Sequence, residues 1–163
     1  MRRTLLSCAV VFVSLILIGL AIAQEAKSPH VMVAAADLKW GPPPPVFEKG
    51  ATFTVLSGDP GKPGLFVVRL TMPAGYKIAP HWHPTDEHVT VLAGTFALGM
   101  GEKFDDASMK ELTAGGYALL PAEMRHFAMA KTQAMVQVHG TGPFTLTYVD
   151  PADDPSKRAA PTP

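Results

Sequence analysis

The stretch GYKIAPHWHPTDEHVTVLAG, residues 75–94, carries two histidines and a glutamate at alternate positions, His81, His83 and Glu87. Alternate side chains of an extended strand point to the same face, so the spacing predicts that two imidazoles and a carboxylate converge on one side of one strand. Imidazole and carboxylate are suitable ligands for Zn, Fe, Mn, Ni or Cu. A fourth ligand must come from elsewhere in the chain, and His126 is the candidate.

The same stretch resembles the first sequence signature of the cupins. That signature reads Gly, five residues, His-x-His, three or four residues, Glu, six residues and Gly. Its fixed positions are matched by Gly75, His81, His83, Glu87 and Gly94. A lone His-x-His is a weak motif, whereas five matches at defined gaps are specific.

The second cupin signature reads Gly, five residues, Pro-x-Gly, two residues, His, three residues and Asn, and it is matched only in part. Gly115, Pro121 and His126 stand at the required spacings. Glu123 stands where Gly is usual, and Ala130 stands where Asn is usual. These departures concern a turn and one supporting polar contact, so the resemblance still implies His126 as a ligand.

The resemblance covers residues 51–150 and implies an all-β domain, the small jelly-roll barrel (double-stranded β-helix) of the cupins. It implies one divalent transition metal, Zn, Cu, Fe, Mn or Ni, held by His81, His83, Glu87 and His126. Such a ligand set leaves coordination positions open for substrate, water or dioxygen. Cupins of this pattern include dioxygenases, isomerases, decarboxylases, binding modules and sensors, so fold and ligands do not fix the reaction.

Two classes of function therefore stay open. The first is a metal-dependent, dioxygenase-like oxidoreductase that binds a small organic molecule in its barrel, and the complete ligand set favours it. The second is a non-catalytic, metal-assisted binding or sensing module, which the lack of a clear acid or base favours. Tyr76 and Tyr148 could donate protons, but neither occupies a position that requires this role. We expect the first class.

Glu87 has a competitor for its role as ligand. His88 also follows His83 after a gap of the permitted length. The six residues between Glu87 and Gly94, and the shared parity of Glu87 with both histidines, favour Glu87. His88 is then expected on the opposite, solvent-facing side.

The same parity predicts which side chains line the barrel. The expected inward-facing core residues on the two motif strands are Val89, Val91, Phe96 and Leu98. Gln137 and His139 alternate with two valines, so either pair could face inward. An outward-facing polar pair is favoured, and an inward-facing Gln137 could instead bind a ligand.

From residue 51 onward, β-branched and apolar runs alternate with clusters of Gly, Pro and Asp. Seven or more short strands are expected, which is typical of an antiparallel barrel or sandwich. Helix is scarce, with one plausible helical turn at residues 105–111. No internal repeat is visible, so we expect a single barrel domain.

The N-terminal segment has the pattern of a secretory signal. Arg2 and Arg3 precede an uncharged apolar stretch that ends in Ala-Ile-Ala at residues 21–23. We expect residues 1–23 to be removed, so that a periplasmic or secreted protein begins at Gln24. An uncleaved membrane anchor is the alternative, because the apolar stretch is just long enough to span a bilayer.

The composition bears on whether the mature protein has disulfides and on which partners it can bind. Cys8, the one cysteine, lies in the expected signal, so the mature protein would have no disulfide. The full chain carries 14 basic and 14 acidic residues, and loss of Arg2 and Arg3 would leave 12 basic ones. No basic stripe is present, so we expect no nucleic-acid partner. Because the apolar segment ends in a processing site, we expect no stable membrane association after its removal.

Residues 24–50 form a proline-rich arm with Trp40 beside four consecutive prolines at residues 42–45. Prolines cannot donate ladder hydrogen bonds, so this arm is expected to lie over the barrel or along its edge. We also expect a homodimer in which the arm contacts the second barrel. Residues 151–163 have no hydrophobic face to bury, which predicts a disordered tail.

Overall fold

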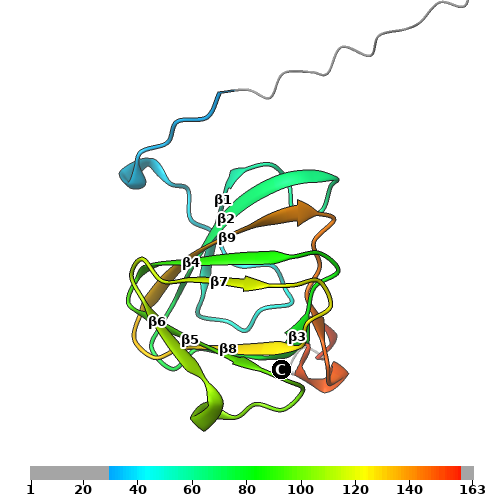
Figure 1. The fold of residues 1–163 in the computed structure, drawn as a ribbon. Helices are drawn as coiled ribbons and strands as arrows, with labels where there is room; N and C mark the ends of the chain where they lie inside the picture. The colour runs from blue at the N-terminus through cyan, green and yellow to red at the C-terminus, as the bar shows by residue number, and fades with distance from the viewer. Residues whose placement is uncertain (1–29, 159–163) are drawn as a thin grey trace, which may run out of the picture. The chain divides into compact units, whose positions relative to one another are not determined.

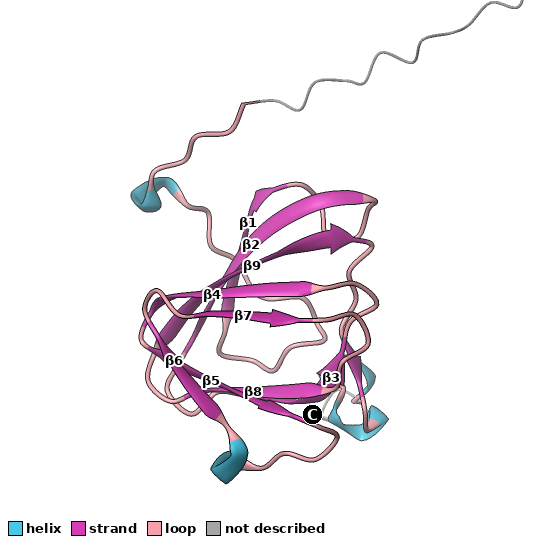
Figure 2. Cartoon of the chain, viewed as in Figure 1, coloured by secondary structure: helices cyan, strands magenta, loops and turns pink. Residues whose placement is uncertain are grey.

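A computed structural model of the chain describes residues 30–158. The expected signal segment, the beginning of the arm and residues 159–163 lie outside the described residues. The described chain folds into two antiparallel sheets that face one another (Figure 1). Helix is confined to short 3-10 turns (Figure 2). In the part of the chain that the structure describes, no helix is long and apolar enough to span a membrane.

The first sheet has five strands in the order β1-β2-β9-β4-β7. Their bounds are β1 (Thr52–Ser57), β2 (Gly64–Met72), β9 (Ala134–Gly142), β4 (Glu87–Ala93) and β7 (Tyr117–Leu120). In β2, β4 and β9 buried and half-buried residues alternate, as expected for strands with one face on the core.

The second sheet has the order β10-β3-β8-β5-β6. Its strands are β10 (Thr147–Tyr148), β3 (Lys77–Trp82), β8 (His126–Ala130), β5 (Thr95–Met100) and β6 (Lys110–Thr113). The expected helical turn at residues 105–111 is shorter than predicted, because it comprises η2 (Asp106–Ser108) and then gives way to β6. The two sheets confirm the predicted all-β barrel.

The inner faces of both sheets form one apolar core. Val89, Val91, Phe96 and Leu98 are all buried in it, as parity predicts. Gly94 makes the tight turn from β4 to β5 with a φ of 73°, and a Cβ there would lie 2.0 Å from the Gln133 carbonyl oxygen. Only glycine fits this turn, which explains the glycine at this point of the first signature.

The arm reaches the barrel through backbone and side-chain contacts. Gly41 exchanges two backbone hydrogen bonds of 2.9 Å with Phe53 of β1. Farther along, the Tyr148 hydroxyl donates to the Val46 carbonyl at 2.8 Å, and the Tyr76 hydroxyl donates to the Glu48 carbonyl at 2.7 Å. Both tyrosines therefore hold the arm, and their hydroxyls are not free to donate protons to a ligand. A short 3-10 turn, η1 (Ala35–Asp37), precedes this attached part.

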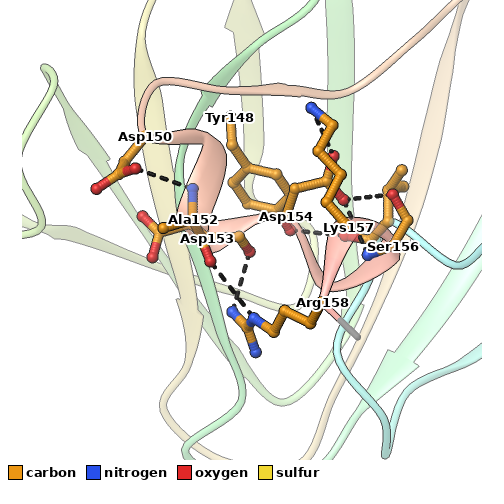
Figure 3. Close-up of polar contacts among 9 residues, drawn as sticks. Tyr148, Asp150, Ala152, Asp153, Asp154, Ser156, Lys157 and Arg158 are labelled. Atoms are coloured by element: carbon orange, nitrogen blue, oxygen red, sulfur yellow. Dashed lines mark hydrogen bonds and ion pairs between the residues drawn. The ribbon is translucent and has the colours of Figure 1, made fainter. Parts of the chain in front are cut away.

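The C-terminal segment contradicts the expected disorder over residues 151–158. Two 3-10 turns follow β10, η3 (Pro151–Asp153) and η4 (Pro155–Lys157). The carboxylates of Asp150 and Asp154 each accept a hydrogen bond from the backbone N–H two residues later, which caps the turns (Figure 3). Arg158 pairs with Glu48 of the arm. Sequence reasoning missed these caps because it weighed hydrophobicity and not local capping.

The buried hydroxyl of Tyr76, which donates to the arm, makes the stability of the fold depend on pH in the alkaline range. Burial, reinforced by the negative charge of Glu48, raises the pKa of Tyr76 to about 12. Tyrosine in the unfolded chain loses its proton near pH 10, whereas folded Tyr76 keeps it. Stability from this group is therefore present below pH 10 and is lost as the pH rises towards 12.

We expect urea unfolding midpoints to fall from about pH 10 upward, and to fall less steeply in the Tyr76→Phe variant. The variant should start from a somewhat lower stability because it lacks one hydrogen bond, so the slopes are compared and not the absolute values. Identical slopes for the two proteins would contradict the role of Tyr76.

Candidate metal centre

The four predicted ligands come together at one end of the barrel interior. His81 lies on β3, His83 directly follows β3, Glu87 opens β4 and His126 opens β8. His81 and His126 face each other across the β3–β8 ladder. The expectation that His81, His83 and Glu87 share one strand is wrong, because β3 ends at Trp82 and the chain bends before β4 begins. The side chains still converge, because β3 and β4 belong to the two facing sheets and both turn these side chains toward the interior between them.

Each histidine is fixed through its Nδ1 atom. The carbonyl oxygens that contact these atoms belong to Ala79 for His81 at 2.7 Å, Thr145 for His83 at 2.8 Å and Met124 for His126 at 2.9 Å. A carbonyl oxygen can only accept, so each Nδ1 carries the hydrogen and donates it. Each Nε2 is left with a bare lone pair, as is usual for histidines that bind metals.

The metal-binding atoms of the three histidines lie within 4.8 Å of one another. Glu87 adds a carboxylate oxygen, Oε2, 3.5 Å from His83 Nε2 and 3.3 Å from His126 Nε2. All four residues are buried. The three imidazoles thus form one cluster, and the Glu87 carboxylate lies beside two of them. His88 takes no part in the cluster.

Burial sets the charge state of the centre. Desolvation, followed by repulsion from His126 and His83, lowers the pKa of His81 to about 3. Desolvation also lowers the pKa of His83, although Glu87 opposes the shift. Burial by itself favours a raised pKa for Glu87, but its contacts with His126 and His83 outweigh burial and lower the pKa. At neutral pH, His81 and His83 are therefore neutral and Glu87 is ionised.

The donor set fits a metal ion. The Nε2 atoms of His83 and His126 are buried and have no hydrogen-bond partner in the structure. Orphaned buried polar atoms are costly, and a cation bound between them would satisfy both. Neutral imidazoles with one carboxylate are a ligand set for a divalent transition metal. The cluster of His81, His83 and His126 thus points to a bound metal ion.

A cavity of about 420 Å³ opens from this centre into the barrel. Its wall comes from the inward faces of both sheets, from the arm and from the loop between β9 and β10. The arm contributes Pro44, Val46 and Phe47, and the loop contributes Phe144, Thr145 and Leu146. The volume lies within the range of small-molecule pockets.

The ChrR cupin-like domain family matches residues 28–145, which is most of the chain. The chain belongs to this family. A comparison with curated proteins finds no match.

Three solved structures illustrate the fold that this cupin shares. The polyketide cyclase RemF from Streptomyces resistomycificus is 19% identical with a TM-score of 0.65, over 79% of this chain and 92% of that one. A Methylibium petroleiphilum PM1 protein assigned as an acetylacetone dioxygenase is 23% identical with a TM-score of 0.62, over 80% and 88%. An acetylacetone dioxygenase from Acinetobacter johnsonii is 16% identical with a TM-score of 0.60, over 80% and 84%. At these identities the likeness establishes the fold alone.

Two residues of the cupin centre have no counterpart in the sequence motifs. The ring of Phe144 stacks on the ring of His83 with centroids 4.1 Å apart and planes 17° apart. Thr145 supplies the carbonyl that accepts from His83 Nδ1. Both lie in the loop after β9, about 60 residues from His83, and no local spacing indicates that the loop returns to the centre.

Glu123 shows how this cupin accommodates the departure from the second signature. Its φ of 62° is the left-handed conformation that glycine usually supplies. The turn still contacts the candidate metal centre, because the Glu123 N–H donates to the His83 carbonyl at 2.8 Å. The turn geometry expected at the usual glycine position is thus retained with a bulkier residue.

The outer face of the first sheet carries the other histidines of the barrel. The rings of His88 and His139, cross-strand partners on β4 and β9, stack with centroids 4.7 Å apart. His88 Nδ1 lies 2.7 Å from the Tyr117 hydroxyl. Gln137 also faces outward, where it accepts a hydrogen bond from Arg69. The polar pair on β9 therefore points away from the cavity, as favoured.

Proposed function

We propose that this cupin is an exported, metal-dependent oxidoreductase of the dioxygenase type that acts on a small organic molecule in its barrel. The observation that carries the proposal is the set of bare Nε2 atoms at the polar end of a cavity. His81, His83, Glu87 and His126 would hold one divalent metal. When bound, a redox-active metal such as Fe, Mn or Cu supplies Lewis-acid and one-electron chemistry with dioxygen.

The residues of the chain prepare the site for that chemistry. The backbone carbonyls fix the tautomers of the three histidines, so no change of tautomer is needed on metal binding. The ionised Glu87 offsets part of the charge of a cation. The apolar wall excludes water from the organic molecule and leaves the histidine end as the place where its polar group can lie.

A non-catalytic, metal-assisted binding or sensing module is the second candidate, and one observation favours it. Among residues 30–158, Thr145 is the single polar residue that lines the cavity besides the four ligands. No side chain in the cavity would therefore be available as a general acid or base, which favours a binding module. If the protein is an enzyme, the compatible reaction is an oxidation that needs no general acid or base.

Oxygen consumption separates the two candidates. Protein loaded in turn with Fe, Mn, Ni, Cu or Zn is mixed with apolar oxygen-containing compounds in an oxygen electrode cell. We expect uptake of dioxygen with one redox-active metal, and none in the His126→Ala variant. If a ligand binds tightly but no dioxygen is consumed with any of the metals, the protein is a binding module and not an enzyme.

Export and assembly stay predictions. An intact mass that begins at Gln24, measured on protein recovered outside the cytosol, would support signal removal. Light scattering of the mature protein, repeated after deletion of residues 24–45, would test the homodimer and the part that the arm plays in it.

A further inference from the structure

The cavity has one polar end and an otherwise apolar wall. Apart from the four ligands and Thr145, every residue that lines it is apolar. The Thr145 carbonyl is already engaged by His83 Nδ1. A hydroxyl, amide or second charge on the far part of a ligand would therefore lie against apolar side chains that offer it no hydrogen bond. An unpaired polar group of this kind weakens binding by about tenfold or more.

The charges of the centre limit the charge of the ligand. Residues bind a metal in their deprotonated forms, so three imidazoles and one carboxylate would leave a bound divalent ion with about one uncompensated positive charge. No Lys or Arg of the described chain lines the cavity. The positive charge of the metal site would thus balance one negative charge at the metal-binding end of a ligand. A second negative charge elsewhere on the ligand would have no positive partner.

The wall is also rich in aromatic rings. Five of the eight phenylalanines of the chain line the cavity, namely Phe47, Phe53, Phe66, Phe96 and Phe144. Phe66 and Phe144 pack together with ring centroids 5.0 Å apart. Ring edges and faces on several sides suit a flat or branched apolar body of about the size of a substituted benzene ring.

We propose that the barrel selects organic molecules with one singly ionised, oxygen-containing chelating end and an apolar, ring-sized body, and that it rejects molecules with a polar group at the far end. The part of this inference that concerns the chelating end rests on the proposed metal function. The part that concerns the apolar body rests on the cavity wall alone.

Three probes with the same carboxylate end test the selection. Calorimetry with Zn-loaded protein would compare 3-phenylpropanoate, 3-(4-hydroxyphenyl)propanoate and 3-(4-carboxyphenyl)propanoate. We expect the unsubstituted probe to bind tightest, the hydroxyl probe to bind about tenfold or more weakly, and the dicarboxylate to give no measurable heat. Equal affinities, or a preference for either polar probe, would overturn the proposal.

Metal-free protein keeps the two parts of the inference apart. We expect propylbenzene to bind it at least about tenfold more tightly than 4-propylphenol. If none of Fe, Mn, Ni, Cu and Zn binds, the proposed function fails, while this pair still tests the apolar body. Absence of propylbenzene binding would overturn the inference about the wall.

A matched pair of variants places the probe in the barrel. Ala128 is buried and lines the cavity, so Ala128→Leu should reduce the affinity for propylbenzene by filling part of the space. Gln137→Leu on the outer face of β9 should leave that affinity unchanged. If Ala128→Leu, shown to be folded by circular dichroism, binds propylbenzene as tightly as the unaltered protein, the probe lies elsewhere and the proposal fails.

Discussion

Replacement of His83 by Ala is expected to abolish tight binding of divalent metal and to remove the metal-dependent rise in melting temperature. The imidazole is one of three whose bare Nε2 atoms converge, and it alone stacks on Phe144. With metal at about 1,000 times its dissociation constant, the unaltered protein gains about 4 kcal/mol by linkage, and the variant should lose that gain. Metal stoichiometry by plasma emission and melting curves with and without metal would measure both effects.

His88→Ala is the matched control for this experiment. The side chain lies on the next strand, one residue from Glu87, but it faces outward and contacts Tyr117 and His139. Metal content and the metal-dependent rise in melting temperature should both survive this change. Loss of metal from the His88 variant, or full metal content in the His83 variant, would contradict the assignment of the ligands.

The fold and the clustering of the candidate ligands were predictable because they depend on local rules. Alternation placed Val89, Val91, Phe96 and Leu98 inside, and all four are buried. The two signatures brought together residues from β3, β4 and β8, since each signature spans a strand end and the turn beside it. The error over a single shared strand did not disturb the ligand set, because the bend after β3 returns Glu87 to the same interior.

The remainder of the site depends on contacts between distant segments, which spacing does not encode. Phe144 and Thr145 reach His83 from the loop after β9. Val46 and Phe47 line the cavity because Tyr148 holds the arm through a hydrogen bond across 102 residues. No motif marks these positions in the sequence, and only the folded chain brings them together.

The second large effect is expected from Phe66, which links the core to the metal centre. Its side chain is 1% exposed and packs against Phe144, which in turn stacks on His83. The backbone of β9 also approaches closely at Gly140, the cross-strand partner of Phe66, since a Cβ there would lie 3.3 Å from the Phe66 ring. Removal of this ring would therefore leave a void between the sheet and the residue that supports a ligand.

Phe66→Ala is accordingly expected to lower the free energy of unfolding by about 3–5 kcal/mol, the usual cost of truncating a buried phenylalanine. Metal affinity should fall as well, because Phe144 would lose the packing that holds it on His83. Leu65→Ala, the neighbouring residue on the outer face of β2 with 79% exposure, should change stability by less than about 0.5 kcal/mol. Urea titrations with an unchanged m-value would measure the difference. A loss below about 1 kcal/mol in Phe66→Ala would mean that the wall of the cavity closes around the missing ring, and that the cavity is more pliable than its close packing implies.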